Sequence, residues 1–234
     1  MAKKNTWLKS LIISILDRFF PSRFYSKSAY SQDGEDLVLA SFYEGRETYK
    51  GFFVDVGAHH PYRFSNTCLF YKRGWRGINI EPTPDLFKKF EIHRKRDINL
   101  NCGIGNGETL NFYIFNEGAL NTFDEERAKE LDGSKNGKYK LIATQNIKTR
   151  LLKDILDEHL PANQKIDLLT IDVEGMDFTV LQSNDWTKYQ PEFIFIECAQ
   201  TDNSIFEDEI YKFLVDKGYN IVGRTRRTTL FKKI

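Results

Sequence analysis

Apolar residues follow two patterns along most of this chain. Runs of consecutive apolar positions, such as residues 52–54, predict strands that are buried on both faces, as in a parallel sheet covered by helices. Segments with apolar residues three or four positions apart predict helices between those strands. The repeated order of strand, helix and strand is typical of parallel strands joined by right-handed crossovers.

The predicted strands are numerous enough to form one large sheet. We expect seven strands, at residues 51–58, 77–82, 98–103, 166–175, 193–198, 220–223 and 228–232. We expect helices at residues 64–72, 85–93, 150–159, 178–181 and 205–216. The last two strands are separated by a short turn, which favours an antiparallel hairpin. The predicted fold class is therefore α/β, with one mixed and mostly parallel sheet.

One region between the strands is less regular. It contains a predicted strand at 110–115, a short helix at 123–131, a polar loop at 133–138 and a strand at 139–148. An insertion of this kind beside a ligand-binding face commonly shapes an acceptor pocket or a lid. We expect one domain over residues 31–234, with this insertion near 105–149, preceded by a separate segment, 1–30.

Residues 1–30 contain a predicted amphipathic helix. Its apolar positions repeat at helical spacing and are Leu8, Leu11, Ile12, Ile15, Leu16 and Phe19. Two interpretations fit: a helix lying in a membrane interface, or a helix packed on its own domain or on a second subunit of a homo-oligomer. No apolar run reaches the roughly 18–20 residues that span a bilayer, and Asp17 and Arg18 interrupt the region in a way that argues against a signal peptide.

Composition and charge narrow the classes of function. The 234 residues include 34 basic and 33 acidic side chains, a net charge of +1 that excludes a global attraction to nucleic acid. The three cysteines, Cys68, Cys102 and Cys198, are widely spaced. This spacing fits reduced thiols in a cytoplasm and argues against a disulfide framework or a cysteine zinc site.

Polar residues follow several predicted strands at their carboxyl ends, where open α/β sheets bind their ligands. The first strand contains Asp55 and ends at Gly57, whose missing Cβ lets its backbone approach a ligand. Glu81 ends the next strand, 24 residues after Gly57, where an acidic residue can accept hydrogen bonds from both hydroxyls of a ribose. Asp172 and Glu174 end a later strand.

A short helix is predicted to begin near Asp33, ahead of the first strand. Acidic residues in its first turn interact favourably with the helix dipole. Gln32 and Glu35 are placed where they could reach a ligand bound at the neighbouring strand end.

These motifs together resemble those of the FkbM-type methyltransferases. They are Phe53-Val54-Asp55-Val56-Gly57-Ala58, Gly74-Trp75-Arg76-Gly77, Ile80-Glu81-Pro82 and Ile171-Asp172-Val173-Glu174-Gly175. Ser31-Gln32 with Gly34-Glu35-Asp36, and His59-His60-Pro61 with Ser65-Asn66-Thr67, resemble a branch found among bacterial surface-polysaccharide genes. The resemblance extends from about residue 31 to the C-terminus. It implies a class I, Rossmann-like fold that uses S-adenosylmethionine to O-methylate a sugar or a similar hydroxyl.

The resemblance also implies roles for individual residues. Asp55 and Gly57 would line the methionine portion of the cofactor, Glu81 would hold its ribose, and Cys102 and Gly103 would border the adenine, with Gln32 as a further cofactor-binding residue. Many members of the family have Asn and Gly after the Gly-Ala pair, where this chain has His59, His60 and Pro61.

Methyl transfer to a sugar hydroxyl requires close alignment and removal of a weakly acidic proton. The candidates for the general base are His60, Asp172 and Glu174. Of the two adjacent histidines we favour His60 over His59, because Pro61 restricts the preceding residue to an extended conformation.

A divalent metal is a separate hypothesis. Asp172 and Glu197 end two strands that should be neighbours, and His60 could complete a mixed nitrogen and oxygen set. Such a set suits Mg²⁺ or Mn²⁺, or Fe²⁺ if the histidine takes part. The metal would lower the pKa of the acceptor hydroxyl and orient the substrate.

The leading hypothesis is an S-adenosylmethionine-dependent O-methyltransferase that acts on a nucleotide-linked or lipid-linked sugar in capsule or O-antigen biosynthesis. It would work in the cytoplasm, either free or peripherally at the inner face of the membrane. A dehydrogenase that uses NAD is the first alternative, although the GxGxxG spacing is absent. A non-catalytic, membrane-docked accessory module is the second.

Overall fold

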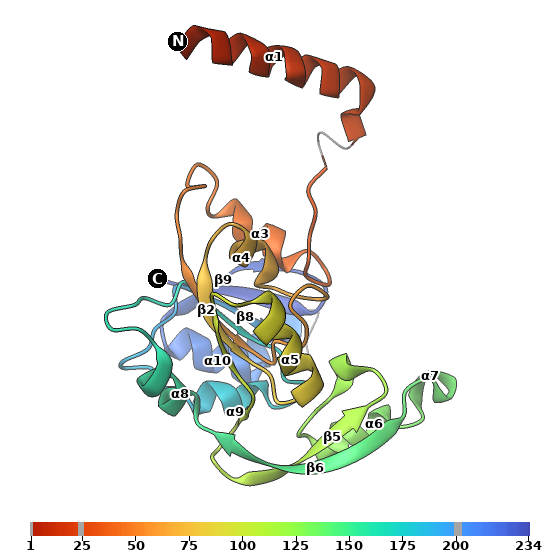
Figure 1. Ribbon diagram of the computed structural model, residues 1–234. Coiled ribbons are helices and arrows are strands. Elements are labelled where there is room, and N and C mark those ends of the chain that lie inside the picture. Colours follow the sequence, from red (N-terminus) through yellow and green to blue (C-terminus); the bar gives the residue numbers. More distant parts are fainter. Residues whose placement is uncertain (1, 23–25, 199–202) are drawn as a thin grey trace.

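The computed structural model describes residues 2–22, 26–198 and 203–234. At its centre is a seven-stranded sheet with the order β3-β2-β1-β7-β8-β10-β9 (Figure 1). The strands are β1 (Phe52–Val56), β2 (Arg76–Ile80), β3 (Ile98–Leu100), β7 (Leu168–Ile171), β8 (Phe193–Glu197), β9 (Tyr219–Arg224) and β10 (Thr228–Lys233). Only β10 runs antiparallel to its neighbours, β8 and β9. The predicted mostly parallel sheet with a C-terminal antiparallel hairpin is confirmed.

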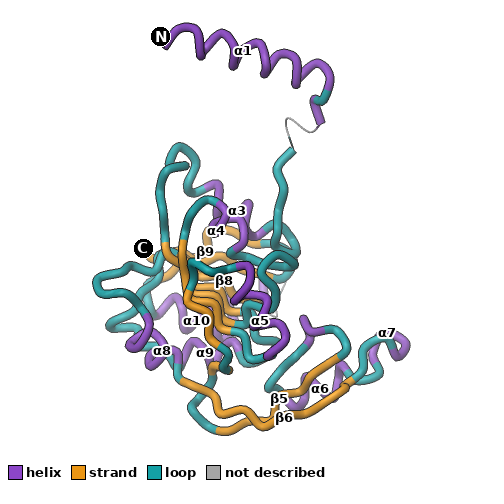
Figure 2. The backbone as a smooth tube through the Cα atoms, viewed as in Figure 1, coloured by secondary structure: helices purple, strands orange, loops and turns teal. Residues whose placement is uncertain are grey.

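Helices cover both faces of this sheet (Figure 2). They are α3 (Glu35–Ser41) and α4 (Cys68–Lys72) on one face, and α8 (Leu152–His159), α9 (Asp177–Gln182) and α10 (Glu209–Asp216) on the other. Successive residues of a strand face opposite sides, so Phe53 packs toward α3 and α4 while Val54 and Val56 pack toward α8, α9 and α10. The remaining helices of the domain are α5 (Pro84–His93), which begins with a proline in its first turn, and the 3-10 helix η2 (Asn203–Glu207).

Residues 103–150 form a separate layer, which we call the arm. It contains a three-stranded sheet of β4 (Gly103–Ile104), β6 (Leu141–Arg150) and β5 (Thr109–Phe115) in that order. Its helices are η1 (Gly118–Leu120), α6 (Glu125–Leu131) and α7 (Ser134–Gly137). In Figure 1 the arm projects from the domain below and to the right of α5.

The structure differs from the predicted elements in several places. The strand expected at 166–175 ends at Ile171, and the helix expected at 205–216 is divided into η2 and α10. The strand expected at 98–103 is divided, because Asn101 turns the chain by donating hydrogen bonds to the carbonyl oxygens of Glu81 and Pro82, at 2.8 and 2.9 Å. The helix expected from residue 64 begins only at Cys68, since Phe64 has a φ of +57°. The polar loop expected at 133–138 contains the short turn α7.

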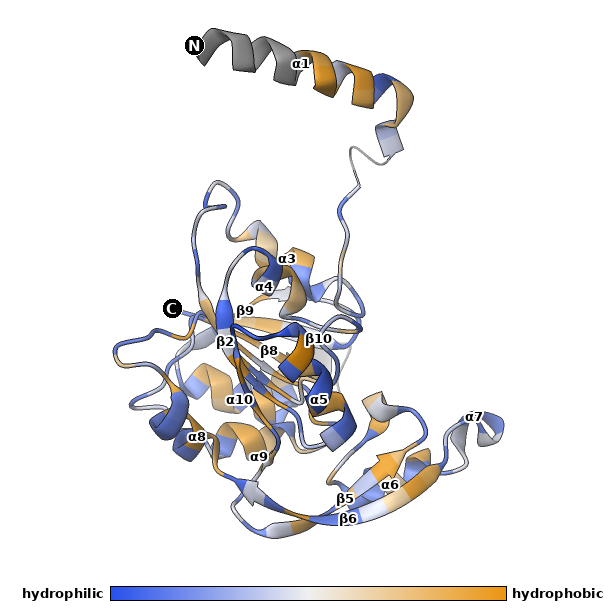
Figure 3. Ribbon diagram, in the orientation of Figure 1, coloured by the Kyte–Doolittle hydropathy of each residue, from blue (hydrophilic) through white to orange (hydrophobic). Residues whose placement is uncertain are grey.

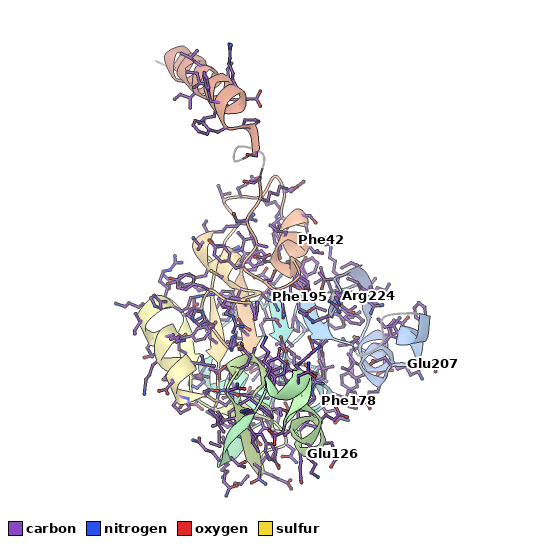
Figure 4. The ribbon with its side chains drawn as sticks, turned by 90° about the vertical axis from the view of Figure 1, so that its right-hand side faces the viewer. Phe42, Glu126, Phe178, Phe195, Glu207 and Arg224 are labelled. Carbon is purple, nitrogen blue, oxygen red and sulfur yellow. The ribbon has the colours of Figure 1, made fainter. Side chains whose placement is uncertain are left out.

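The N-terminal helix α1 (Ala2–Phe19) lies apart from the α/β domain in two perpendicular views (Figures 1 and 4). Figure 3 shows mostly hydrophobic residues along the second half of this helix. The apolar side chains from residue 11 to residue 20, just after the helix, are exposed, with Phe19 at 65% and Phe20 at 59%. The structure therefore does not show the expected alternative in which this helix packs on its own domain. Within the described residues, none of the helices combines the length and apolarity that crossing a membrane requires.

Candidate functional site

A pocket of about 560 Å³ opens beside the carboxyl ends of β1, β2, β7 and β8 and extends along the arm. The predicted site residues that line it are Gln32, Asp55, Gly57, Glu81, Cys102, Gly103, Asp172, Glu174 and Glu197. His60 does not line this pocket, whereas His59 does. The acidic strand ends predicted from the sequence thus meet in one cavity, of the size that small-molecule cofactors occupy.

Gly57 lets the backbone at the end of β1 lie close to the backbone at the end of β7. Its φ is +79°, and a Cβ at this position would overlap the carbonyl oxygen of Asp172. The backbone N–H groups of Gly57 and Ala58 both donate to the carbonyl of Ile80, at 3.0 and 3.1 Å. A residue with a side chain would therefore be strained and would push β7 away from the pocket.

Asp55 lies in a row of polar residues that crosses the sheet. Register places Asp55 beside Asn79 of β2 and Thr170 of β7. Thr67 donates to Asp55 Oδ2 at 2.7 Å, and Asn66 donates to Thr170 at 3.1 Å, so the loop after β1 is held against this row. Burial raises the pKa of Asp55 to about 6, although the bond from Thr67 opposes the shift. The carboxylate of Asp55 thus both holds the loop through Thr67 and lines the pocket.

Arg94, which is not among the residues predicted from the sequence, supports the same loop from the protein interior. Its fully buried guanidinium donates to the carbonyl of Pro61 at 2.9 Å and to Ser65 Oγ at 3.1 Å, and lies 3.6 Å from Asp97. A buried arginine needs such partners, because an unpaired buried charge is costly. In the sequence Arg94 is indistinguishable from the exposed basic residues that commonly end helices.

Glu81 is oriented by two backbone groups. The N–H of His59 donates to its Oε2 at 2.8 Å, and the N–H of Thr83 donates to its Oε1 at 2.7 Å. A carboxylate offers about four acceptor positions, and because the Thr83 side chain also hydrogen-bonds to Glu81, about one position remains for a ribose hydroxyl. Burial raises the pKa of Glu81 to about 7. Glu81, the residue predicted to bind the ribose, is therefore held in place even without a bound cofactor.

The preference for His60 over His59 does not fit this geometry. His60 Nδ1 accepts hydrogen bonds from the backbone N–H groups of Tyr62 and Arg63, both at 3.1 Å, so its ring caps the turn after Pro61. His59, with a φ of +53°, lies in the pocket wall instead. Burial and then the charge of Arg63 lower the pKa of His59 to about 4, which keeps the ring neutral.

Four carboxyl groups gather where β7 and β8 end. Asp172 and Glu197 face the pocket from neighbouring parallel strands, with Glu174 and the buried Asp177 close to them. Desolvation within the protein and the charge of Glu197 raise the pKa of Asp172 well above its usual range, although the side chain is open to the pocket. Desolvation and the charge of Glu174 raise the pKa of Glu197 to about 7. This arrangement favours binding of a cation.

The predicted metal site is not assembled. Across residues 2–22, 26–198 and 203–234, no group of three or more His, Cys, Asp and Glu side chains is arranged to hold a metal ion. His60 is engaged with the backbone outside the pocket and cannot join Asp172 and Glu197. The prediction that His60, Asp172 and Glu197 together bind a metal ion is therefore wrong.

An apolar slot lies beside the end of β3. It is formed by pocket-lining residues: Cys102 and Gly103, with Phe112 and Phe123 of the arm, whose ring centroids are 4.6 Å apart. A Cβ at Gly103 would come within 2.5 Å of the Phe123 ring. Burial raises the pKa of Cys102 to about 11, so the thiol is neutral. The slot suits a flat, uncharged ring such as adenine. Phe123 was not predicted from the sequence, because it lies in an irregular insertion whose pattern does not show which side chains face the pocket.

A family comparison decides the class of protein. The family described as "Methyltransferase FkbM domain" matches residues 55–221. The chain belongs to the FkbM methyltransferase family. The family implies S-adenosylmethionine as the methyl donor of its members. The residues fit this cofactor: Glu81 for the ribose, the apolar slot for the adenine, and carboxylates for the sulfonium charge.

Two solved structures are similar to this FkbM chain. One is the methyltransferase FkbM from Methylobacillus flagellatus KT, with 15% identity and a TM-score of 0.45, covering 78% of this chain and 43% of its own. The other is a putative RNA methyltransferase from Pyrococcus horikoshii, with 10% identity and a TM-score of 0.40, covering 90% and 92% of the two chains. The chain thus spans less than half of the first relative. No curated protein matches it.

Proposed function

We propose that this FkbM-family protein transfers a methyl group from S-adenosylmethionine to a sugar hydroxyl. The observation that carries the proposal is that Asp172 and Glu197 open onto the same pocket as Glu81. Glu81 would place the nucleoside, and the two other carboxylates would receive the acceptor at the opposite end. We propose residues 31–234 as the catalytic unit, with the insertion near 105–149 shaping the acceptor side.

Asp172 is the residue we assign as general base. Methyl transfer is an in-line displacement, so most of the rate enhancement comes from alignment, worth about 7–11 kcal/mol in favourable cases. When bound, the cofactor supplies an electrophilic methyl group on a positive sulfur. Asp172 would accept the hydroxyl proton, and desolvation together with the charge of Glu197 raises its pKa, which makes it a stronger proton acceptor than an ordinary aspartate.

A sugar suits the polar groups around Asp172. Gln32, Asn66 and Thr170 line the same pocket and offer neutral donors and acceptors, which match an acceptor with several hydroxyl groups. Gln32 and Asn66 belong to the two motifs that resemble the surface-polysaccharide branch. We therefore propose a nucleotide-linked or lipid-linked sugar of capsule or O-antigen biosynthesis as the acceptor.

Calorimetry separates this proposal from its alternatives. The full chain is titrated with S-adenosylhomocysteine and with NAD. We expect the first to bind and the second not to bind. Binding of NAD alone would support a dehydrogenase, and binding of neither would support an accessory module. A panel of nucleotide sugars with labelled methyl donor then identifies the acceptor, and label in none of them would reject the sugar assignment.

We also propose that α1 places the enzyme at the inner face of the membrane. Within residues 1–30, six of the seven charged residues are basic, and Asp17 is the one acid. The side chains of Leu11, Ile12, Ile13, Ile15, Leu16, Phe19 and Phe20 are exposed. An apolar helix face with basic flanks is complementary to an anionic lipid surface, which we take as the occupant.

Co-sedimentation with vesicles tests this location. We expect the full chain to bind phosphatidylglycerol-containing vesicles and to bind pure phosphatidylcholine weakly. Ile12→Glu with Leu16→Glu should abolish binding, whereas Ser14→Gln on the polar side should not. A dimer in light scattering that the double variant dissociates, without vesicle binding, would show instead that the helix contacts a second copy.

A further inference from the structure

The arm lines the pocket with positive charge, opposite in sign to the strand ends. Arg127, Lys135 and Lys138 all come from the arm and line the same cavity as Asp172 and Glu81. Ser134 and Tyr139 lie beside them in the pocket wall and add hydroxyl groups. The cavity is therefore acidic where the sheet borders it and basic where α6 and α7 border it.

The two lysines differ from the other cations of the pocket in their partners. Arg127 pairs with Glu174 at 3.1 Å, Arg63 pairs with Glu117 at 2.9 Å, and Arg227 lies 3.5 Å from Asp33. None of the ion pairs formed by the described residues includes Lys135 or Lys138. Two unneutralised ammonium groups in a pocket wall attract an anion.

The segment that carries these lysines is a tight turn. Lys135, Asn136 and Gly137 have φ values of +52°, +58° and +78°. Asn116 anchors its base by donating to the carbonyl of Lys138 at 2.9 Å and by exchanging hydrogen bonds with Lys140 at 2.9 and 3.0 Å. The lysines are thus presented by a short turn whose base is anchored next to the ends of β5 and β6.

We propose that Lys135 and Lys138 bind the diphosphate group of an activated sugar. This inference rests on the proposed function and names the part of the acceptor that the arm recognises. A neutral sugar needs hydroxyl contacts but no cations, whereas a nucleotide sugar and a lipid-linked sugar both carry a diphosphate. Lysine binds phosphate as a point charge, and two lysines can neutralise two phosphoryl groups. Arg127 lines the same pocket and is already paired with Glu174.

Calorimetry on the full chain, saturated with S-adenosylhomocysteine, tests the site. The probes are inorganic pyrophosphate, UDP and farnesyl diphosphate. Lys135→Ala with Lys138→Ala should weaken binding of the probes by about tenfold or more, since one ion contact of ~1.4 kcal/mol corresponds to tenfold. The matched control is Lys140→Ala, on the same segment but outside the pocket wall, which should change affinity less than about twofold.

The outcomes are distinguishable. Tighter binding of UDP than of farnesyl diphosphate identifies a nucleotide sugar, and the reverse order identifies a lipid-linked one. The site is rejected if no probe binds, or if the double variant binds all of them as tightly as the wild type does. It is also rejected if the double variant loses S-adenosylhomocysteine, because the lysines would then serve the cofactor. Failure of the wild type to bind S-adenosylhomocysteine would instead reject the proposed function.

Discussion

The two sides of the pocket are built in different ways. The sheet side, comprising Asp55, Gly57, Glu81 and Asp172, consists of strand ends that are fixed by contacts between residues distant in the sequence. The arm side, comprising Arg127, Lys135 and Lys138, stands on short local structure and is largely exposed. The difference suggests that the sheet side determines the reaction and the arm side selects the acceptor. Changes on the two sides should therefore differ in kind and size.

The largest effect is expected from Gly57→Ala. The left-handed backbone and the overlap with the Asp172 carbonyl should destabilise the fold by about 2–4 kcal/mol and abolish cofactor binding. Thermal unfolding and calorimetry measure both. Gly107→Ala is the matched control, since its φ of +88° has open space around it and only the backbone strain, about 1–2 kcal/mol, applies. Equal losses in the two variants would contradict the close contact between β1 and β7.

The next effect separates chemistry from binding on the sheet side. Asp172→Asn should lower kcat by about 10²- to 10⁴-fold, because the acceptor proton loses its base. Affinity for S-adenosylhomocysteine should stay within about threefold, since a neutral ligand gains little from this charge. Rapid-quench turnover and calorimetry give the two values. A variant that keeps full turnover would remove Asp172 from the mechanism.

Glu81→Gln tests whether Glu81 binds the ribose of the cofactor. Loss of charge-assisted hydrogen bonds of about 1.5–3 kcal/mol should weaken S-adenosylhomocysteine binding by roughly ten- to a hundredfold. Glu108→Gln is the control, because Glu108 is exposed and does not line the pocket. Unchanged affinity in Glu81→Gln would falsify the ribose assignment.

The stability of the folded protein should depend on pH through the carboxyl groups of the sheet side. The folded-state pKa values of Asp55 (about 6), Glu81 (about 7) and Glu197 (about 7) are raised, so folding favours their protonated forms. Their contribution to stability is present below pH about 4 and is lost as the pH rises through 6 to 7. The Tm of the ligand-free protein should therefore fall from pH 5 to pH 8.

Cofactor affinity should follow the opposite trend. S-adenosylmethionine carries one more positive charge than S-adenosylhomocysteine, so ionisation of the carboxylates should tighten the former more than the latter between pH 6 and pH 8. Calorimetric titrations at pH 6 and pH 8 give the ratio of the affinity for S-adenosylmethionine to that for S-adenosylhomocysteine. A pH-independent ratio would mean that the sulfonium lies away from these acids.

The smallest effect is expected where the two sides meet. Arg63, on the loop after β1, pairs with Glu117 of the arm through two hydrogen bonds of 2.9 and 3.0 Å, and both side chains are partly exposed. Glu117→Gln should cost about 0.2–1 kcal/mol of stability, and less at high salt. Urea unfolding at low and high salt measures it. A loss above about 2 kcal/mol would show that the arm is integral to the fold of the sheet side.

Sequence patterns alone determined the sheet and its acidic edge. Runs such as Phe52–Val56 are apolar on both faces, and that local property requires a strand covered on both sides. Because parallel strands bring their carboxyl ends to one edge, Asp55, Glu81 and Asp172 had to lie near each other. That each of these residues stands at or near the carboxyl end of a strand can be read from its own strand, although contacts between distant residues then fix where each strand end lies.

Only the tertiary structure decided which side chains around that edge face the pocket. His59 rather than His60 lines it because the ring of His60 binds the turn at Tyr62 and Arg63. Arg94 is buried because the loop after β1 needs donors beneath it. Lys135 and Lys138 reach the cavity because the arm sheet directs their turn there. The partners of Arg94 and Lys138 lie far away in the sequence, whereas His60 binds backbone groups two and three residues further on. Neither kind of contact can be read from periodicity, which reports only how a residue relates to its own element.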